Sequence, residues 1–328
     1  MGSRPRIHSI VAVGLFACAI FLCAPVCAQT PAVATNLLAS ASPTPDEPPA
    51  DFVFQKSVDE VRLLFTVVNH KGKFISDLKQ EDFQLLDDRQ PPEKINSFQQ
   101  ETDLPLRVAL VVDISGSISN RFKYEQGSAI EFFKKILRPS IDKALIIGFD
   151  EKIHVEQDLT NNVDDLKAAV HRLKPHGETA LYDAVIVAAD RLRAESEKGT
   201  RKVIVLISDG DSNSGRAIMA DAQQAALRAE APIFTLSTND VQTNGYSHGE
   251  ATLELLSRYT GGELLPAHYR DQVAHAFKQV EQALRSQYAL AYKPAEFSHD
   301  GRYRPVKLTA RDSKLNVECR HGYFASKD

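Results

Sequence analysis

The sequence is poor in cysteine, and its few cysteines are not spread along the chain. Three of the four, Cys18, Cys23 and Cys27, fall within the first 28 residues. The rest of the chain contains only Cys319, which has no second cysteine to pair with. The fold that follows residue 28 is therefore expected to form without an internal disulfide.

The chain also lacks the signatures of several functional classes. Its net charge is −4 with both signs interspersed, and no basic stretch is interleaved with aromatic residues, so nothing indicates a nucleic-acid partner. It has no G-x-S-x-G elbow, P-loop, G-x-G-x-x-G or H-E-x-x-H motif, which argues against a nucleotide site and against an enzyme. A hydrolase remains the rival class, because ten histidines and many serines could meet in the fold.

Only one long apolar run occurs, at residues 10–24, and two arginines precede it. Small residues at 26–28 are typical of a signal-peptidase site, so residues 1–28 are predicted to be a signal peptide. Retention of this segment as a membrane anchor is the alternative. Residues 29–50 are rich in Pro, Ala, Ser and Thr and are predicted to be a disordered linker. We therefore expect an exported protein, periplasmic, in the cell envelope or secreted.

The two flanks of the remaining chain predict β-structure. Residues 51–104 and 288–328 each contain short stretches in which apolar and polar residues alternate, as in half-buried strands. Neither flank has enough strands to bury a sheet alone. We therefore expect the two to pair into one small β-sandwich, with the middle of the chain inserted between its halves. The predicted strands lie at 61–67, 83–85, 94–98, 288–292, 306–310 and 315–319.

Residues 105–287 follow a different rhythm, in which apolar strands alternate with amphipathic helices. This alternation predicts an α/β domain, a doubly wound and mostly parallel sheet with helices on both faces. The run Val108–Val112 is apolar throughout, as expected for a central strand covered on both sides. Further predicted strands lie at 144–149, 154–159, 203–207 and 233–236, and predicted helices at 181–192, 217–230, 253–259 and 273–284.

Oxygen-bearing side chains follow the central strand directly. Asp113, Ser115 and Ser117 are each separated by one residue, around a glycine that allows a sharp turn. Carboxylates and hydroxyls are hard donors that suit Mg²⁺, Mn²⁺ or Ca²⁺ rather than zinc. Taken alone, this pattern is also that of a polar turn.

Two more loops of the predicted sheet carry such donors. Thr179 stands just before a helix, where it could serve only as the N-cap, and Asp209 ends a core strand in what could be a plain Asp-Gly turn. Because the carboxyl ends of parallel strands meet at one edge, the three loops are expected to converge. Together they predict a metal site formed by Asp113, Ser115, Ser117, Thr179 and Asp209. Asp183 is a further candidate, although an acid in a first helical turn more commonly interacts with the helix dipole.

With these motifs the segment at 105–287 resembles a von Willebrand factor type A domain with a metal-ion-dependent adhesion site, of the kind found in bacterial exported proteins. The resemblance implies that Ser115 and Ser117 bind a divalent cation, most commonly Mg²⁺, through their hydroxyls. It implies that Thr179 binds directly or through water, and that Asp113 and Asp209 hold coordinated waters. A partner protein then offers an Asp or Glu carboxylate to the open position.

The expected function is thus an exported, metal-dependent, adhesion-type protein-binding module. The alternative is a structural envelope scaffold whose metal only stabilises loops. Partner choice is expected to lie in the loops around the cation, above all in the loop at 239–249, which lacks apolar periodicity. The predicted partner-binding rim consists of His176, Asp211, Asn239, Asp240, Asn244 and His248.

Overall fold

A computed structural model describes residues 60–101, 103–115, 122–195, 197, 199–239 and 247–325. The predicted signal peptide and linker lie outside these residues, as do Ser117, Asp240 and Asn244 of the predicted site. The chain divides into two compact units, Met1–Gln55 and Lys56–Asp328, and all described residues belong to the second.

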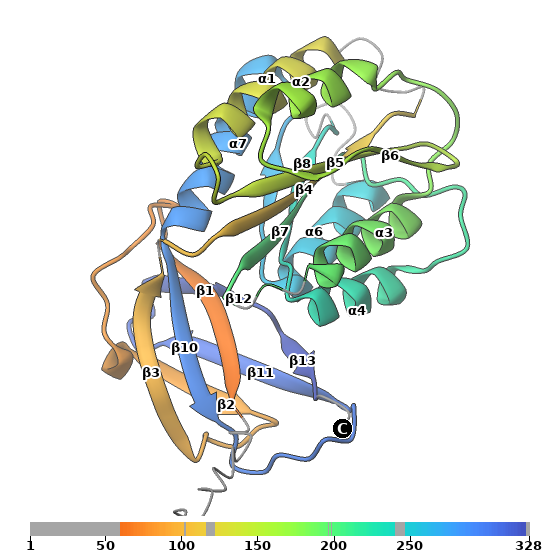
Figure 1. Cartoon of the computed structure of the whole chain (residues 1–328). Coiled ribbons are helices and arrows are strands. Elements are labelled where there is room, and N and C mark those ends of the chain that lie inside the picture. The colour runs from red at the N-terminus through yellow and green to blue at the C-terminus, as the bar shows by residue number, and fades with distance from the viewer. Residues whose placement is uncertain are drawn as a thin grey trace, which may run out of the picture. The chain divides into compact units, whose positions relative to one another are not determined.

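The middle of the chain forms a six-stranded sheet with the order β6-β5-β4-β7-β8-β9 (Figure 1). All neighbouring strands are parallel except β6, which pairs antiparallel with β5 at the edge. The central strand β4 is buried along its whole length, as the apolar run predicted. The strands are β4 Leu106–Asp113, β5 Lys143–Phe149, β6 Ile153–Thr160, β7 Arg201–Ser208, β8 Ile233–Ser237 and β9 Leu264–Pro266.

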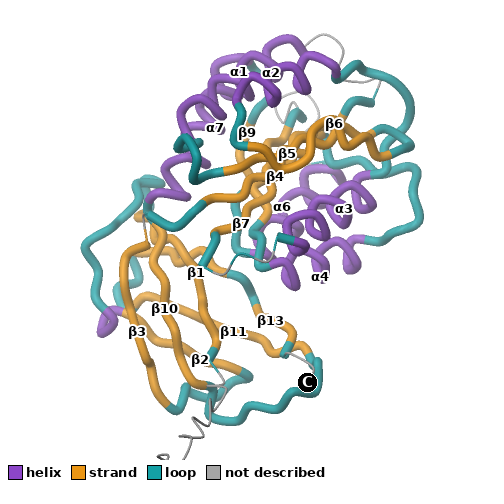
Figure 2. The backbone as a smooth tube through the Cα atoms, viewed as in Figure 1, coloured by secondary structure: helices purple, strands orange, loops and turns teal. Residues whose placement is uncertain are grey.

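Helices cover both faces of this sheet (Figure 2). Alternate residues of β4 face opposite sides, so Val108 and Leu110 pack in the core under α1, α2 and α7, while Ala109 and Val111 pack under α3, α4 and α6. The predicted doubly wound fold is confirmed. The helices are α1 Phe122–Ile136, α2 Val163–Arg172, α3 Leu181–Ala194, α4 Met219–Ala229, α6 His248–Thr260 and α7 Arg270–Arg285.

The two flanks together form a β-sandwich, as predicted. Strands β1 and β3 from the N-terminal flank pair with β10 and β12 from the C-terminal flank in the sheet β12-β1-β10-β3. A second sheet has the order β13-β11-β2. Their inner faces share one apolar core. The elements are β1 Val61–Asn69, a 3₁₀ turn Gln80–Asp82, β2 Phe83–Asp87, β3 Lys94–Glu101, β10 Gln287–Lys293, β11 Tyr303–Ala310, β12 Leu315–Cys319 and β13 Gly322–Phe324.

The α/β part is joined to the sandwich at the amino-terminal edge of the six-stranded sheet. Its first strand, β4, begins at Leu106, a few residues after β3 ends. Its last helix, α7, ends at Arg285 and is followed by β10 from Gln287, so a single residue, Ser286, joins the helix to the sandwich. The metal loops are expected at the opposite edge.

The structure differs from the sequence prediction in several elements. Helices α1 and α2 and the short strand β9 were not predicted. Helix α6 begins at His248 rather than near 253, because Ser247 accepts a hydrogen bond from Glu250 N (3.1 Å) and caps the helix. The predicted loop at 239–249 is therefore too long by two residues.

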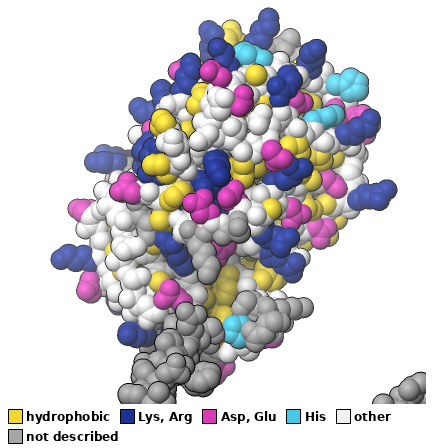
Figure 3. Space-filling view, viewed as in Figure 1, with side chains coloured by type: hydrophobic (Ala, Val, Ile, Leu, Met, Phe, Trp, Pro, Cys, Tyr) yellow, Lys and Arg dark blue, Asp and Glu magenta, His cyan; other side chains and the backbone are white. Residues whose placement is uncertain are grey.

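None of the helices described is long and apolar enough to cross a bilayer. On the face shown in Figure 3, acidic and basic side chains are interspersed.

Candidate metal centre

The strand register brings two of the predicted loops together. Strands β4 and β7 pair in parallel with Val112 opposite Ile207, so Asp113 and Ser208 end neighbouring strands at the same level. The Ser208 hydroxyl donates a hydrogen bond to Asp113 Oδ2 (2.8 Å). Asp209 follows directly, and the carboxyl edge of the sheet therefore gathers the first and third loops.

Asp113 is the most enclosed acid of this group, with 1% of its surface exposed. The backbone N–H of Ser115 donates to its Oδ1 (2.9 Å), and Ser208 binds the other oxygen. Burial raises the pKa of Asp113 to about 6, and the nearby charge of Asp209 adds to this shift while the serine hydrogen bonds oppose it. No Lys or Arg contacts this carboxylate among the described residues, so its charge has neutral partners only.

The second predicted loop, which carries Thr179, is held beside the others by backbone contacts. Ala180 N donates to the carbonyl of Asp150, which follows β5, and so fixes the start of α3. Asn213 binds Thr179 on both sides: its Oδ1 accepts from Thr179 N (2.8 Å), and its N–H donates to Thr179 O (3.1 Å). The N-cap of α3 is Ala180 and not Thr179. Thr179 therefore lies one residue before the N-cap instead of occupying it.

Asp209 lies in a turn that depends on two glycines. Gly210 has a φ of +83°, and a Cβ there would lie 2.1 Å from the carbonyl oxygen of Gly249. A Cβ on Gly249 would in turn lie 2.2 Å from the carbonyl oxygen of Asp209. The turn after β7 thus packs backbone against backbone on the start of α6. Asp211 N donates to Asp209 Oδ1 (3.2 Å), and the close approach of this segment to α6 fixes the position of Asp209.

The described members of the predicted rim lie around this edge. His176 is exposed, with 77% of its side chain accessible, and Asp211 and His248 are also exposed. Asn239 turns inward, where its amide donates to the carbonyl of Asp209 and to Glu250 Oε2 (3.4 Å). Asn239 therefore supports the Asp209 loop, whereas the other three face solvent.

Asp183 has a different partner from the one considered in the sequence. Its Oδ2 accepts from the backbone N–H groups of Arg216 (3.0 Å) and Ala217 (3.2 Å). This carboxylate holds the segment after Asp211 against the start of α3, which accounts for it without a metal.

Three supporting residues were missed in the sequence. The sequence analysis gave no role to Ser208 or Asn213, and Glu250 fell between the predicted loop at 239–249 and the predicted helix at 253–259. Glu250 is 7% exposed and accepts a hydrogen bond from Ser237 Oγ (2.5 Å). Of these three residues, only Ser208 and Asn213 could have been singled out from the sequence, because short polar residues after a strand end commonly bind the loop backbone.

A second group of possible metal ligands, two acids and a histidine, lies beside the β5–β6 turn. One ligand atom from each of Asp150, Glu151 and His176 lies within 4.8 Å of the others. Asp150 already accepts from Lys152 N (2.7 Å) and pairs with His154 Nε2 (3.1 Å), while Glu151 Oε2 accepts from Glu178 N (3.1 Å). These contacts explain the positions of both carboxylates, which hold the loop together without a metal.

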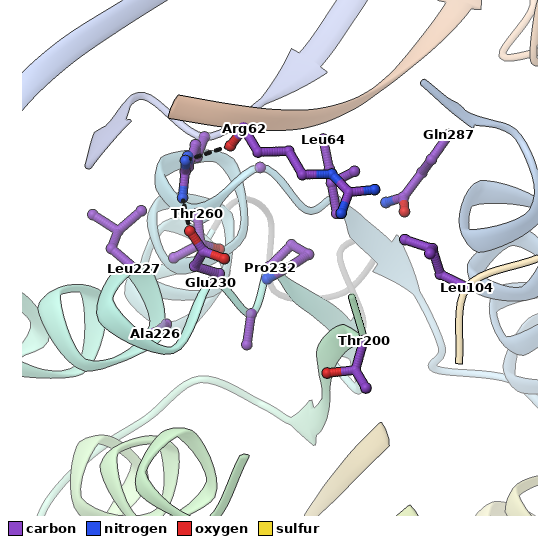
Figure 4. Close-up of a pocket in the computed structure, with 13 residues that line it drawn as sticks. Arg62, Leu64, Leu104, Thr200, Ala226, Leu227, Glu230, Pro232, Thr260 and Gln287 are labelled. Atoms are coloured by element: carbon purple, nitrogen blue, oxygen red, sulfur yellow. Dashed lines mark hydrogen bonds and ion pairs between the residues drawn. The ribbon is translucent and has the colours of Figure 1, made fainter. Parts of the chain in front are cut away.

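The cavity drawn in Figure 4 lies at the other end of the sheet, against the sandwich. It measures about 60 Å³, and Leu104, Thr200 and Gln287 are among its lining residues. Gln287 is 3% exposed, and its Oε1 has no hydrogen-bond partner in the described part of the chain. Because this cavity is small and lies away from the metal loops, we do not regard it as the functional site.

Residues 108–212 match the family model of the von Willebrand factor type A domain. The α/β part of this chain thus contains a domain of that class. The match includes Asp113, Ser115, Thr179 and Asp209, the described members of the predicted metal site.

Solved structures with a similar fold include three bacterial proteins. A variant of the PilB minor pilin from Streptococcus sanguinis is 13% identical with a TM-score of 0.46, and covers 56% of this chain. This chain spans 62% of that pilin, less than two thirds of its length. BatB from Bacteroides thetaiotaomicron is 15% identical with a TM-score of 0.46, over 55% of this chain and 100% of BatB. The vWF domain of the pilus tip protein Mfa5 from Porphyromonas gingivalis is 14% identical with a TM-score of 0.44, over 56% of this chain and 95% of that domain. No curated protein sequence matched this chain.

Proposed function

We propose that this chain is an exported, non-enzymatic protein-binding module whose site is completed by a divalent cation, with Mg²⁺ the first choice. The observation that carries the proposal is the buried Asp113 carboxylate, which ends the central strand and accepts hydrogen bonds from serine groups, with no Lys or Arg in contact among the described residues. A buried carboxylate without a cationic partner is costly. A divalent cation at the loops that follow would offset this cost.

The donor set suits such an ion. Ser115 and Thr179 offer neutral hydroxyls, and Ser117, outside the described residues, is expected to offer a third. Asp113 and Asp209 are placed to orient water and hydroxyl groups around them. All are hard oxygen donors, which favour Mg²⁺, Mn²⁺ or Ca²⁺. When bound, the cation supplies a coordination position that an Asp or Glu carboxylate of a partner protein can fill.

The residues of this chain then have distinct tasks. Ser208 and the N–H of Ser115 hold Asp113 in one orientation, and Asn213 holds the Thr179 backbone. The glycine contact between Gly210 and Gly249 fixes the Asp209 loop. These contacts lie within the chain itself, so they should lower the cost of ordering the described parts of the ligand loops in the binding step.

The test measures cation binding and partner binding separately. Mg²⁺ is titrated into the wild-type chain and into Asp113→Ala while the melting temperature is followed. Partner capture from envelope extract is then compared in Mg²⁺ and in chelator. The proposal requires that Mg²⁺ raises the melting temperature of the wild type only, and that chelator and Asp113→Ala both abolish capture of the same protein. If Mg²⁺ stabilises the chain but capture persists in chelator, the scaffold alternative is correct.

A further inference from the structure

Two exposed tyrosines lie at the starts of α1 and α7. Tyr124 is 40% exposed and Tyr269 is 46% exposed, although most large apolar side chains are buried. The guanidinium of Arg270, the residue after Tyr269, lies 3.7 Å from the ring centroid of Tyr124. We call Tyr124, Tyr269 and Arg270 the tyrosine patch.

Helices α1 and α7 pack side by side on one face of the sheet (Figure 1). The ring centroids of Phe132 and Phe277 lie 4.7 Å apart between them. Helix α1 follows the loop that carries Asp113 and Ser115. Helix α7 follows β9, which is parallel to β8 and so ends at the same carboxyl edge. The first turns of both helices therefore lie at the edge that carries the metal loops.

A continuous set of contacts joins the metal site to the patch. Ser208 Oγ binds Asp113, and the Ser208 carbonyl accepts from Thr238 N (3.0 Å). The Thr238 carbonyl is bonded to His268 Nδ1 (3.0 Å), and the His268 ring meets the ring of Tyr269 edge-on at 4.4 Å. Tyr269 is thus held in place by the same loops that hold the metal ligands.

The chemistry of the patch differs from that of the rest of the edge. Arg270 is exposed, and no acidic side chain of the described residues pairs with it. The other ionisable groups along this edge are mainly acidic: Asp113, Asp150, Glu151, Glu178, Asp209 and Asp211. Tyrosine and arginine are the side chains that most often dominate binding energy at protein interfaces. A cation held over an aromatic ring also remains available to an anion.

We propose that the tyrosine patch is the second contact of the partner-binding surface. It fits a partner protein that presents, beside the carboxylate for the cation, an apolar side chain for Tyr124 and Tyr269 and a second acidic side chain for Arg270. This inference rests on the proposed function, because the cation provides the first contact. It places partner choice on α1 and α7 and not only on the loop at 239–249.

The probe is a phage-displayed peptide library with one fixed Asp between randomised flanks, selected on the full chain in Mg²⁺ and again in chelator. The wild type, Tyr124→Ser/Tyr269→Ser and Arg270→Glu are compared. Leu255→Ser is the matched control, since Leu255 is 55% exposed on α6 and is not part of the patch. Melting temperatures establish that each variant is folded.

On the wild type and on Leu255→Ser, the Mg²⁺-dependent peptides should be enriched in apolar and acidic flanking residues. The double tyrosine variant should lose the apolar enrichment and bind the selected peptides about tenfold more weakly. Arg270→Glu should replace the acidic preference with a preference for Lys and Arg. Mg²⁺-dependent peptides whose flanks are the same on all variants would overturn the tyrosine patch alone. A selection that yields no Mg²⁺-dependent peptide would overturn the proposed function, and the patch with it.

Discussion

Tyr292 and Tyr323 donate hydrogen bonds to the same oxygen, Asp87 Oδ2, at 2.7 and 2.9 Å. Tyr292 belongs to the four-stranded sheet of the sandwich, while Tyr323 and Asp87 belong to the three-stranded sheet. The shared carboxylate therefore joins the two sheets inside the core. Asp87 is 5% exposed, so water can contribute little to its solvation.

We expect Tyr292→Phe to lower the free energy of unfolding by about 1–2 kcal/mol, because a buried charged acceptor loses one of its two phenol donors. Burial and the charge of Asp87 raise the pKa of both tyrosines above the ordinary 10.0. Above pH 10 the unfolded chain loses protons that the native tyrosines retain, so wild-type stability should fall there. Urea unfolding at pH 8 and pH 10.5 checks both points. A Tyr292→Phe variant as sensitive to alkali as the wild type would contradict this account.

Ser208 is expected to matter more for cation binding than for stability. Ser208→Ala removes the donor to Asp113 Oδ2 and the acceptor for Gly210 N (2.9 Å), which connect two of the metal loops. Mg²⁺ affinity should fall about tenfold, the scale of one charged hydrogen bond. Ser208→Thr keeps the hydroxyl and is the matched control. Equal Mg²⁺ affinity for the alanine and threonine variants, measured by calorimetry, would refute the role of this hydroxyl.

The Asp113→Asn variant tests whether the buried charge lowers stability without a cation and raises it when a cation is bound. In chelator at pH 7.5 the variant should be about 1–3 kcal/mol more stable than the wild type, since a neutral amide replaces a buried carboxylate whose partners among the described residues are neutral. In Mg²⁺ the order should reverse, because only the wild type gains from the cation. Chemical unfolding under both conditions tests this. A variant less stable than the wild type in chelator would mean that the carboxylate is already well compensated.

Glu263 and Glu318 form a repulsive pair where β12 approaches the turn before β9. Burial raises the pKa of both, and the charge of Glu318 raises that of Glu263 further. A raised native pKa means that the charged form costs stability at neutral pH, and that the cost disappears as the pH falls through the native pKa. Glu318→Gln should therefore stabilise the chain by about 0.5 kcal/mol at pH 7, the scale of a cross-strand charge pair. Thermal unfolding at pH 7 and pH 3.5 should show the gain only at pH 7.

The N-terminal flank should not fold alone. Strand β1 pairs with β10 and β12, and β3 pairs with β10, so a fragment of residues 51–104 lacks every strand partner of β1 and β3. Its NMR spectrum should be poorly dispersed. Residues 105–287 have their own sheet and two cores and should remain folded without the flanks. Cooperative unfolding of the 51–104 fragment would disprove the split sandwich.

The metal edge was predictable to the extent that it depends on strand ends. Five consecutive apolar residues before Asp113 and another apolar run before Asp209 identify buried parallel strands, and parallel strands end at one edge. The contacts that hold the loops were not predictable, because Asn213 and Glu250 bind groups far from them in the sequence. The tyrosine patch depends on two helices packing together, which neither stretch of sequence indicates.

The direct connection of α7 to β10 determines how the molecule would carry a mechanical load. A pull on a partner at the carboxyl edge would pass through the six-stranded sheet to its amino edge, where the chain enters the sandwich through β3 and β10. These two strands are antiparallel neighbours, and the ends that face the α/β part lie next to each other. Tension would therefore pull β3 and β10 in the same direction. If the chain is held at the start of β1, where Val61 pairs with the far end of β10 at Tyr292, the load would act along β1 and β10, across hydrogen bonds that run perpendicular to them. Such bonds share the force and must break together, so the joint is suited to sustained tension.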